Sequence, residues 1–130
     1  MSSIEINNNV FLLNTNKTSY MFKVNKYKHL EHIYYGDSVE ISDESSLTLK
    51  RNIQYGSTVI YDKKNDIYTL DAFPFEYGTY GTGDFKENSI EIETNNSYTC
   101  DFKYESYEIK DGDIKINGLP SSYGADKTLI

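Results

Sequence analysis

The sequence contains no long apolar run and no tryptophan, and it has only one cysteine and two prolines among 130 residues. A membrane-spanning helix needs about 18 or more predominantly apolar residues, so we expect no transmembrane segment and no membrane partner. Residues 1–9 also lack the basic and apolar regions of a signal peptide. These absences predict a protein of the cytoplasm, where thiols stay reduced.

Few residues are available for metal or thiol chemistry. The single cysteine, Cys100, cannot form an internal disulfide or a cysteine-based zinc site. No activating turn rich in proline or glycine surrounds it and only two histidines could pair with it, so we expect a half-buried strand residue rather than a nucleophilic thiol. His29 and His32 would face opposite sides of a strand, so they would not converge on one metal ion. Residues 111–113 (Asp-Gly-Asp) lack the further acids of an EF-hand loop and favour a hairpin turn. We therefore expect no metal and no cofactor.

The chain is acidic and rich in tyrosine. Its net charge is −7, and the short basic stretch at residues 23–29 is followed by Glu31. An acidic chain repels phosphate backbones, so we expect no nucleic-acid partner. Thirteen tyrosines and six phenylalanines supply much of the apolar surface. A tyrosine has an apolar body and a polar tip, which suits the half-buried faces of β-sheets.

Apolar and polar residues alternate over short stretches separated by turn residues. Tyr20, Phe22 and Val24, for example, would share one side of a strand. The asparagines at residues 7–9 predict a turn because asparagine tolerates left-handed backbone angles. The pattern predicts an all-β fold, an antiparallel β-sandwich. Its short strands are expected at residues 10–13, 19–24, 30–35, 39–41, 58–61, 68–70, 90–92, 98–104, 107–109 and 114–116.

Two expectations concern the last quarter of the chain. Residues 107–109 and 114–116 bracket an Asp-Gly pair, which is a strong hairpin signal. The final residues 128–130 (Thr-Leu-Ile) are β-prone and carry no stop signal. We interpret them as a strand cut off inside a larger protein, whose exposed edge favours association with another chain.

Two stretches interrupt the pattern of strands and turns. Residues 72–88 hold three glycines, one proline and five aromatic residues, a composition typical of a packed and often functional loop. The order of the glycines does not fit a dinucleotide-binding fingerprint, so we expect them to supply positive φ angles or close backbone approach. Residues 51–57 are polar and contain the only arginine, whose guanidinium suits contacts with a sugar or another domain.

These two stretches supply the candidate residues for contact with a substrate or an interface. Glu76 and Asp84 lie inside the aromatic loop, where a buried carboxylate is expected to anchor the loop by accepting backbone N–H bonds rather than to act in catalysis. The candidates are Arg51, Asn52, Glu76, Tyr77, Tyr80 and Asp84.

The segment 68–86 is the most specific feature. It reads Tyr-Thr-Leu-Asp-Ala-Phe-Pro-Phe-Glu-Tyr-Gly-Thr-Tyr-Gly-Thr-Gly-Asp-Phe-Lys, which resembles the N-terminal signature of family 36 α-galactosidases: Leu-Asp-x-x-Pro-x-Glu-Tyr, then Tyr-Gly-x-x-Asp-Phe-Arg. Stretches at residues 18–22, 29–36, 101–109, 118–120 and 126–129 agree in the family's order. Gly78 stands where many members have proline, Lys86 where arginine is common, and residues 51–57 lack the substrate-reaching aspartate of some members.

The resemblance implies an enzyme of three parts: an N-terminal β-supersandwich, a central (β/α)₈ barrel and a small C-terminal β domain. The catalytic aspartates of the family belong to the barrel, so residues 1–130 would form a single non-catalytic β-sandwich segment with no catalytic residue. The resemblance also implies hydrolysis of terminal α-galactosides such as melibiose and raffinose by the full-length enzyme. We expect a homo-oligomer in which this segment packs against the barrel and shapes the substrate pocket or a subunit interface.

Two alternatives stay open. A stand-alone carbohydrate-binding module would be favoured by an exposed, coplanar pair of tyrosines on one sheet face. A protein-interaction β domain would be favoured by an uncovered edge strand near residues 128–130.

Overall fold

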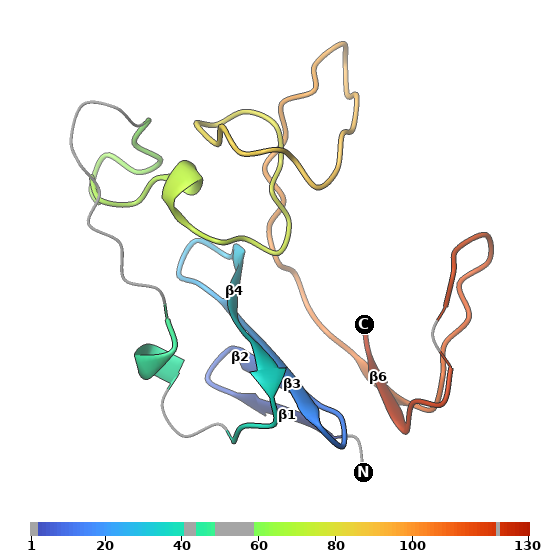
Figure 1. Ribbon diagram of the computed structural model, residues 1–130. Helices are drawn as coiled ribbons and strands as arrows, with labels where there is room; N and C mark the ends of the chain where they lie inside the picture. The colour runs from blue at the N-terminus through green and yellow to red at the C-terminus, as the bar shows by residue number, and fades with distance from the viewer. Residues whose placement is uncertain (1–2, 41–43, 49–58, 122) are drawn as a thin grey trace. The chain divides into compact units, whose positions relative to one another are not determined.

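A computed structural model describes residues 3–40, 44–48, 59–121 and 123–130 (Figure 1). Its regular elements are six β-strands and two short 3₁₀ helices, η1 (Glu44–Ser46) and η2 (Leu70–Ala72). Every strand pairing with a known register is antiparallel, so the predicted all-β, antiparallel class is confirmed. The described part of the chain holds no helix long and apolar enough to cross a membrane.

The chain divides into two compact units, which are described separately. The first consists of Met1–Lys23, Ile33–Thr48 and Glu105–Ile130, and the second of Val24–His32 and Leu49–Tyr104.

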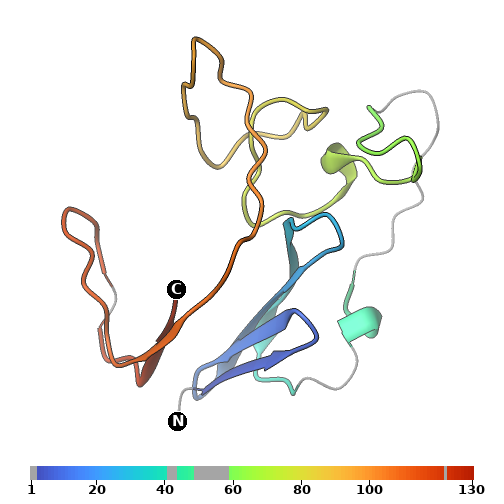
Figure 2. The same ribbon diagram turned by 180° about the vertical axis from the view of Figure 1, so that it is seen from behind.

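Four consecutive strands form the main sheet, in the order β1-β2-β3-β4 (Figures 1 and 2). They are β1 (Ser3–Asn7), β2 (Val10–Asn14), β3 (Thr18–Val24) and β4 (Leu30–Asp37). The first strand was not predicted, but the asparagine turn that follows it was. Asn8 and Asn9 have φ angles of 47° and 66° and join strands whose last paired residues are Asn7 and Val10. Two successive positive φ angles are what a tight type I′ hairpin requires.

The alternation along β2 and β3 gives the sheet two apolar faces in the first unit. On one face Val10, Leu12 and Met21 are buried together. On the other, Phe11 stacks on Phe22 at 4.9 Å between ring centroids. The edge of Tyr107 packs against Phe11 at 5.3 Å, so the segment from Glu105 onward covers part of this second face. Successive side chains of a strand point to opposite faces, and the sheet is therefore buried from both sides.

The predicted hairpin between residues 107–109 and 114–116 is wrong. Instead β5 (Ile109–Asp111) pairs with β6 (Lys127–Leu129). Asp113 explains the difference, because its carboxylate accepts the backbone N–H groups of Gly124 and Ala125, each at 2.8 Å. These two hydrogen bonds hold residues 124 and 125 beside Asp113, and residues 114–116 belong to no strand. The apolar end of the chain is thus paired along β5 rather than left single.

The strands predicted at residues 59–61, 68–70, 90–92 and 98–104, and at 39 and 40, are not present as strands. These segments make isolated backbone hydrogen bonds in place of ladders, such as Tyr61 N–H to Tyr68 O at 3.1 Å and Cys100 N–H to Tyr80 O at 3.1 Å. In the second unit, ring packing and side-chain hydrogen bonds hold the extended segments together, and period-two alternation does not distinguish that arrangement from a sheet. Residues 41 and 58 lie outside the described residues.

Candidate functional site

A network of titratable side chains centres on His29, which is 7% exposed and directly precedes β4. Its Nδ1 lies 2.7 Å from the hydroxyl of Tyr68, and its Nε2 lies 2.7 Å from Oδ1 of Asp101. The other oxygen of Asp101 accepts the hydroxyl of Tyr61 at 2.6 Å and pairs with the ammonium of Lys103 at 2.9 Å. Three segments distant in sequence therefore meet at one imidazole.

The hydrogen bonds favour one tautomer of His29. Asn25 donates its side-chain N–H to the Tyr68 hydroxyl at 2.8 Å, so that hydroxyl directs its own proton to Nδ1 of His29. The Nε2–H of the ring then donates to Asp101, and the ammonium of Lys103, 2.9 Å from the same nitrogen, donates to Asp101 and Tyr61 instead. A neutral ring with this tautomer satisfies both ring nitrogens.

Burial and hydrogen bonds together set the pKa values in this network. Burial lowers the pKa of His29, and the hydrogen bond to Asp101 opposes that shift without reversing it. Burial acts to raise the pKa of Asp101, but hydrogen bonds from Tyr61, His29 and Lys103 outweigh it and lower the pKa. Burial also raises the pKa of Tyr68, which keeps that phenol protonated. The result is a neutral His29 imidazole beside the ion pair of Asp101 and Lys103.

This arrangement suits a structural role better than catalysis. A general base must be accessible to a substrate proton and must titrate near the working pH. His29 is buried, both of its nitrogens are engaged, and its pKa is lowered. The phenol of Tyr68 cannot act as a nucleophile near neutral pH because its pKa is raised. The network joins three segments of the chain, and we call it the His29 clasp. It consists of His29, Tyr61, Tyr68, Asp101 and Lys103.

Aromatic rings surround the His29 clasp. Tyr68 packs against Tyr27 at 4.2 Å and against Phe73 at 4.9 Å, and Phe75 lies 5.1 Å from the imidazole of His29. Offset and tilted ring pairs of this kind add roughly 0.5–1.5 kcal/mol each beyond area burial. The start of the aromatic loop at residues 72–88 is therefore part of the core of the second unit.

Glu76 anchors the loop to the edge of β4. Its Oε1 lies 2.9 Å from Nδ1 of His32. Two backbone bonds flank this pair, from His32 N–H to Pro74 O at 2.7 Å and from Glu76 N–H to Leu30 O at 2.9 Å. His29 and His32 thus contact different carboxylates.

Asp84 anchors the other side of the loop. Its side chain is 2% exposed, and Oδ1 pairs with the ammonium of Lys86 at 2.7 Å and accepts the backbone N–H of Lys86 at 3.1 Å. The same ammonium donates to the carbonyl of Leu70 at 2.7 Å. Glu76 therefore contacts the imidazole of His32 and Asp84 pairs with Lys86, and the expected anchoring through a backbone N–H group is seen at Asp84.

The glycines allow this loop to turn beside its neighbours. Gly81 and Gly83 have φ angles of +97° and +86°, and a Cβ at either position would lie within 2.6 Å of Thr99 or 2.5 Å of Val59. Both of the expected reasons for glycine therefore apply at these two positions. Gly78 has no positive φ, and it pairs with Ser89 through its carbonyl at 2.9 Å.

The outer side of the loop is aromatic and exposed. Tyr77, Tyr80 and Phe85 are 58%, 57% and 71% exposed. Tyr77 also lines a cavity of about 270 Å³, together with Lys28, His29, Leu30, Ile90, Phe102, Lys103 and Tyr104. Tyr77 and Tyr80 are thus available to a partner, whereas Glu76 and Asp84 face inward.

Arg51 and Asn52 lie outside the described residues. Among the residues that are described, no group of three histidine, cysteine or acidic side chains is placed to hold a metal ion. Sequence reasoning missed the His29 clasp. One available signal was the i, i+2 spacing of Asp101 and Lys103, which puts a carboxylate and an ammonium on the same side of an extended segment.

Comparison with known proteins identifies the family to which this chain belongs. The family model described as "Glycosyl hydrolase family 36 N-terminal domain" matches residues 28–130. The bifunctional alpha-galactosidase/sucrose kinase AgaSK of Mediterraneibacter gnavus is 31% identical over 122 residues, which are 93% of this chain and 13% of that protein. This chain therefore spans about an eighth of that relative's length.

Solved structures agree with the sequence comparison. The galactosidase domain of AgaSK superimposes with a TM-score of 0.80 at 29% identity, covering 98% of this chain and 18% of that one. A variant of the GH36 alpha-galactosidase AgaA from Geobacillus stearothermophilus, solved in complex with raffinose, gives a TM-score of 0.72 at 27% identity and covers 89% of this chain and 16% of that one.

Proposed function

Because the chain belongs to the glycosyl hydrolase family 36 N-terminal domain family, we propose that it is the non-catalytic N-terminal β segment of an α-galactosidase. The full-length enzyme would hydrolyse terminal α-galactosides such as melibiose and raffinose in the cytoplasm. Residues 1–130 would form the first part of its N-terminal β-sandwich. Their partners would be the catalytic barrel and, in a homo-oligomer, the neighbouring subunits.

The observation that carries this proposal is the two-sided construction of the loop at residues 72–88. Its inner carboxylates are held by His32 and Lys86, while Tyr77, Tyr80 and Phe85 are exposed. Exposed aromatics on a fixed backbone are typical of interface anchors, because little conformational entropy is lost when they are covered. This loop is the surface that would meet the rest of the enzyme.

Hydroxyl-radical footprinting tests this role directly. We expect Tyr80 and Phe85 to be oxidised readily in the isolated chain and to be protected in the full-length enzyme. Tyr98, which is 50% exposed and lies outside the loop, is the reference for oxidation in the isolated chain. Equal oxidation of Tyr80 and Phe85 in both proteins would contradict the interface role.

The enzymatic part of the proposal has its own test. The reading frame after residue 130 should encode a barrel with two catalytic aspartates, and its product should release nitrophenol from p-nitrophenyl α-galactoside. A continuation without such a barrel, or a full-length product inactive on α-galactosides, would remove the assignment of substrate.

A further inference from the structure

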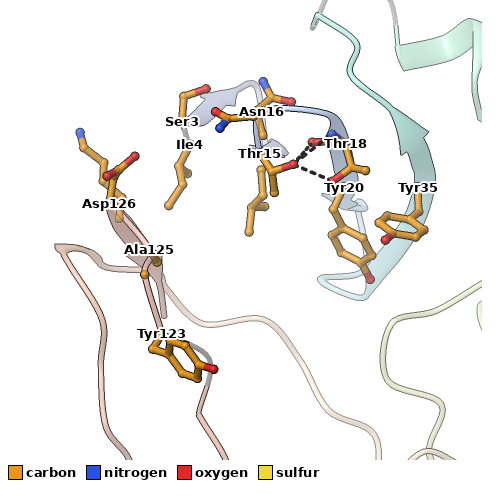
Figure 3. A pocket seen from close by; sticks show the side chains of 14 residues that line it. Ser3, Ile4, Thr15, Asn16, Thr18, Tyr20, Tyr35, Tyr123, Ala125 and Asp126 are labelled. Atoms are coloured by element: carbon orange, nitrogen blue, oxygen red, sulfur yellow. Dashed lines mark hydrogen bonds between the residues drawn. The ribbon is translucent and has the colours of Figure 1, made fainter. Parts of the chain in front are cut away.

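The first unit contains a pocket of about 760 Å³ beside the ends of β1, β2 and β3 (Figure 3). Its lining comes from this unit alone, since β1, the β2–β3 turn, Tyr35 and residues 123–127 all belong to it. The volume falls within the roughly 300–1,000 Å³ that small-molecule sites occupy.

The strand side of the pocket is apolar and aromatic. Ile4 on β1 is paired with Leu13 on β2, and Leu13 is paired with Tyr20 on β3, so the three side chains form a row on one face of the sheet. Tyr35 stands next to Tyr20, with ring centroids 6.0 Å apart and ring planes at 60°. The two rings make a corner rather than a flat platform.

Tyr123 lies on the segment across the pocket from this corner (Figure 3). It is 92% exposed, so neither its ring nor its hydroxyl is needed to fill the core of the unit. Three tyrosines from three segments therefore line one opening. A tyrosine offers an apolar ring face together with a hydroxyl that both donates and accepts hydrogen bonds.

The remaining lining is polar with balanced charge. Asn16 and Thr18 lie at the β2–β3 turn, and Asp126 and Lys127 lie at the start of β6. One carboxylate and one ammonium cancel, so the pocket carries no net charge that would select a phosphate or another anion. Amide, hydroxyl, carboxylate and ammonium groups together supply both donors and acceptors.

We propose that this pocket is a binding site for a neutral oligosaccharide. A sugar ring has apolar C–H faces and a rim of hydroxyls, each of which donates and accepts. Its faces would lie against Tyr20, Tyr35 and Tyr123, and its hydroxyls would meet Asn16 and Asp126. The choice of an α-galactoside as the ligand rests on the proposed function; the choice of a neutral sugar rests on the lining alone.

Raffinose is the probe, titrated into the isotope-labelled 130-residue chain with amide and aromatic resonances followed by NMR. We expect saturable shifts at Tyr20, Tyr35 and Tyr123, with a dissociation constant of the order of 1 mM, which corresponds to about −4 kcal/mol. Y123A should weaken binding roughly two- to tenfold through the loss of one aromatic contact. Y98A, which removes a tyrosine from the second unit, should leave the affinity unchanged.

Three of the results that would overturn the site come from the raffinose titration. They are the absence of saturable shifts, saturable shifts confined to the second unit, and an affinity unaffected by Y123A. Glycerol at an equal hydroxyl concentration shows whether any shift is a general solvent effect, in which case the site is also refuted. If the full-length protein hydrolyses α-galactosides but the titration fails, only the proposed sugar site is refuted. If raffinose binds saturably but the full-length protein is inactive, only the proposed function is refuted.

Discussion

Replacing Asp101 with alanine removes the acceptor that joins the His29 clasp. In the folded chain this carboxylate accepts from Tyr61 at 2.6 Å and from His29 at 2.7 Å, and it pairs with Lys103 at 2.9 Å. The substitution leaves the backbone of an extended segment unchanged. Its effect on the free energy of unfolding therefore measures what the clasp contributes.

The size of the effect follows from which partners can reach water. Lys103 has a side chain that is 35% exposed, so it can be hydrated after the substitution at little cost. The Nε2–H of His29 cannot, because its side chain is 8% exposed. A buried donor left without an acceptor costs about 1–3 kcal/mol, and hydrogen bonds to a charged acceptor are each worth about 1.5–3 kcal/mol. We expect D101A to lower the free energy of unfolding by about 2–4 kcal/mol.

Urea denaturation of D101A and the unchanged chain, followed by circular dichroism, measures this difference. E108A is the matched control, since Glu108 also faces a lysine at 3.2 Å but its side chain is 63% exposed. Exposed pairs contribute about 0–1 kcal/mol, so E108A should change stability by less than about 1 kcal/mol. If D101A proved no more destabilising than E108A, the clasp would not hold the second unit together and the reasoning above would fail.

Three further predictions concern other groups. Burial lowers the pKa of His29 from its ordinary value of 6.5, so the unfolded chain binds a proton at a higher pH than the folded chain does. The free energy of unfolding should therefore fall as the pH drops below about 6.5. Denaturation at pH 5, 6 and 7 measures this dependence, which should be weaker in H29Q. G83A should lose more stability than G124A, because both glycines have positive φ but only at Gly83 would a Cβ meet Val59, at 2.5 Å. Thermal melting compares the two variants, and left-handed strain alone should cost each about 1–2 kcal/mol. Equal losses would show that the side chain of Val59 moves aside without cost. The isolated chain should release no nitrophenol from p-nitrophenyl α-galactoside, and turnover that a carboxylate substitution in this chain abolished would refute its non-catalytic role.

Strands β2, β3 and β4, and the turn before β2, could be predicted from the sequence because their determinants are local. Asn8 and Asn9 set the first turn by their own backbone preferences, and the alternation of Tyr20 and Phe22 with Met21 assigns side chains of β3 to the two faces. Each of these signals depends on residues a few positions apart. Period and turn chemistry are sufficient at that range.

The second half could not be read in the same way because its determinants are distant in sequence. Asp113 pairs with backbone groups of residues 124 and 125, and His29 meets Asp101, which is 72 positions away. A hairpin signal at the Asp-Gly pair competes with such contacts, and the sequence does not reveal which one prevails. The same reasoning explains why Glu76 and Asp84 were recognised as anchors while their partners, His32 and Lys86, were not assigned to them.

The carboxylate of Asp113 has a consequence for how this chain tolerates change. By binding the backbone of Gly124 and Ala125, it fixes both ends of the intervening segment next to the β5–β6 pair. The entropic cost of closing a loop rises only slowly with its length, by about 0.6 kcal/mol for each doubling. Residues inserted near Gly118, in the turn of this segment, would leave the strand pairing intact. A reporter peptide or an affinity epitope could be displayed at that position, and natural length variation among relatives is expected to concentrate there.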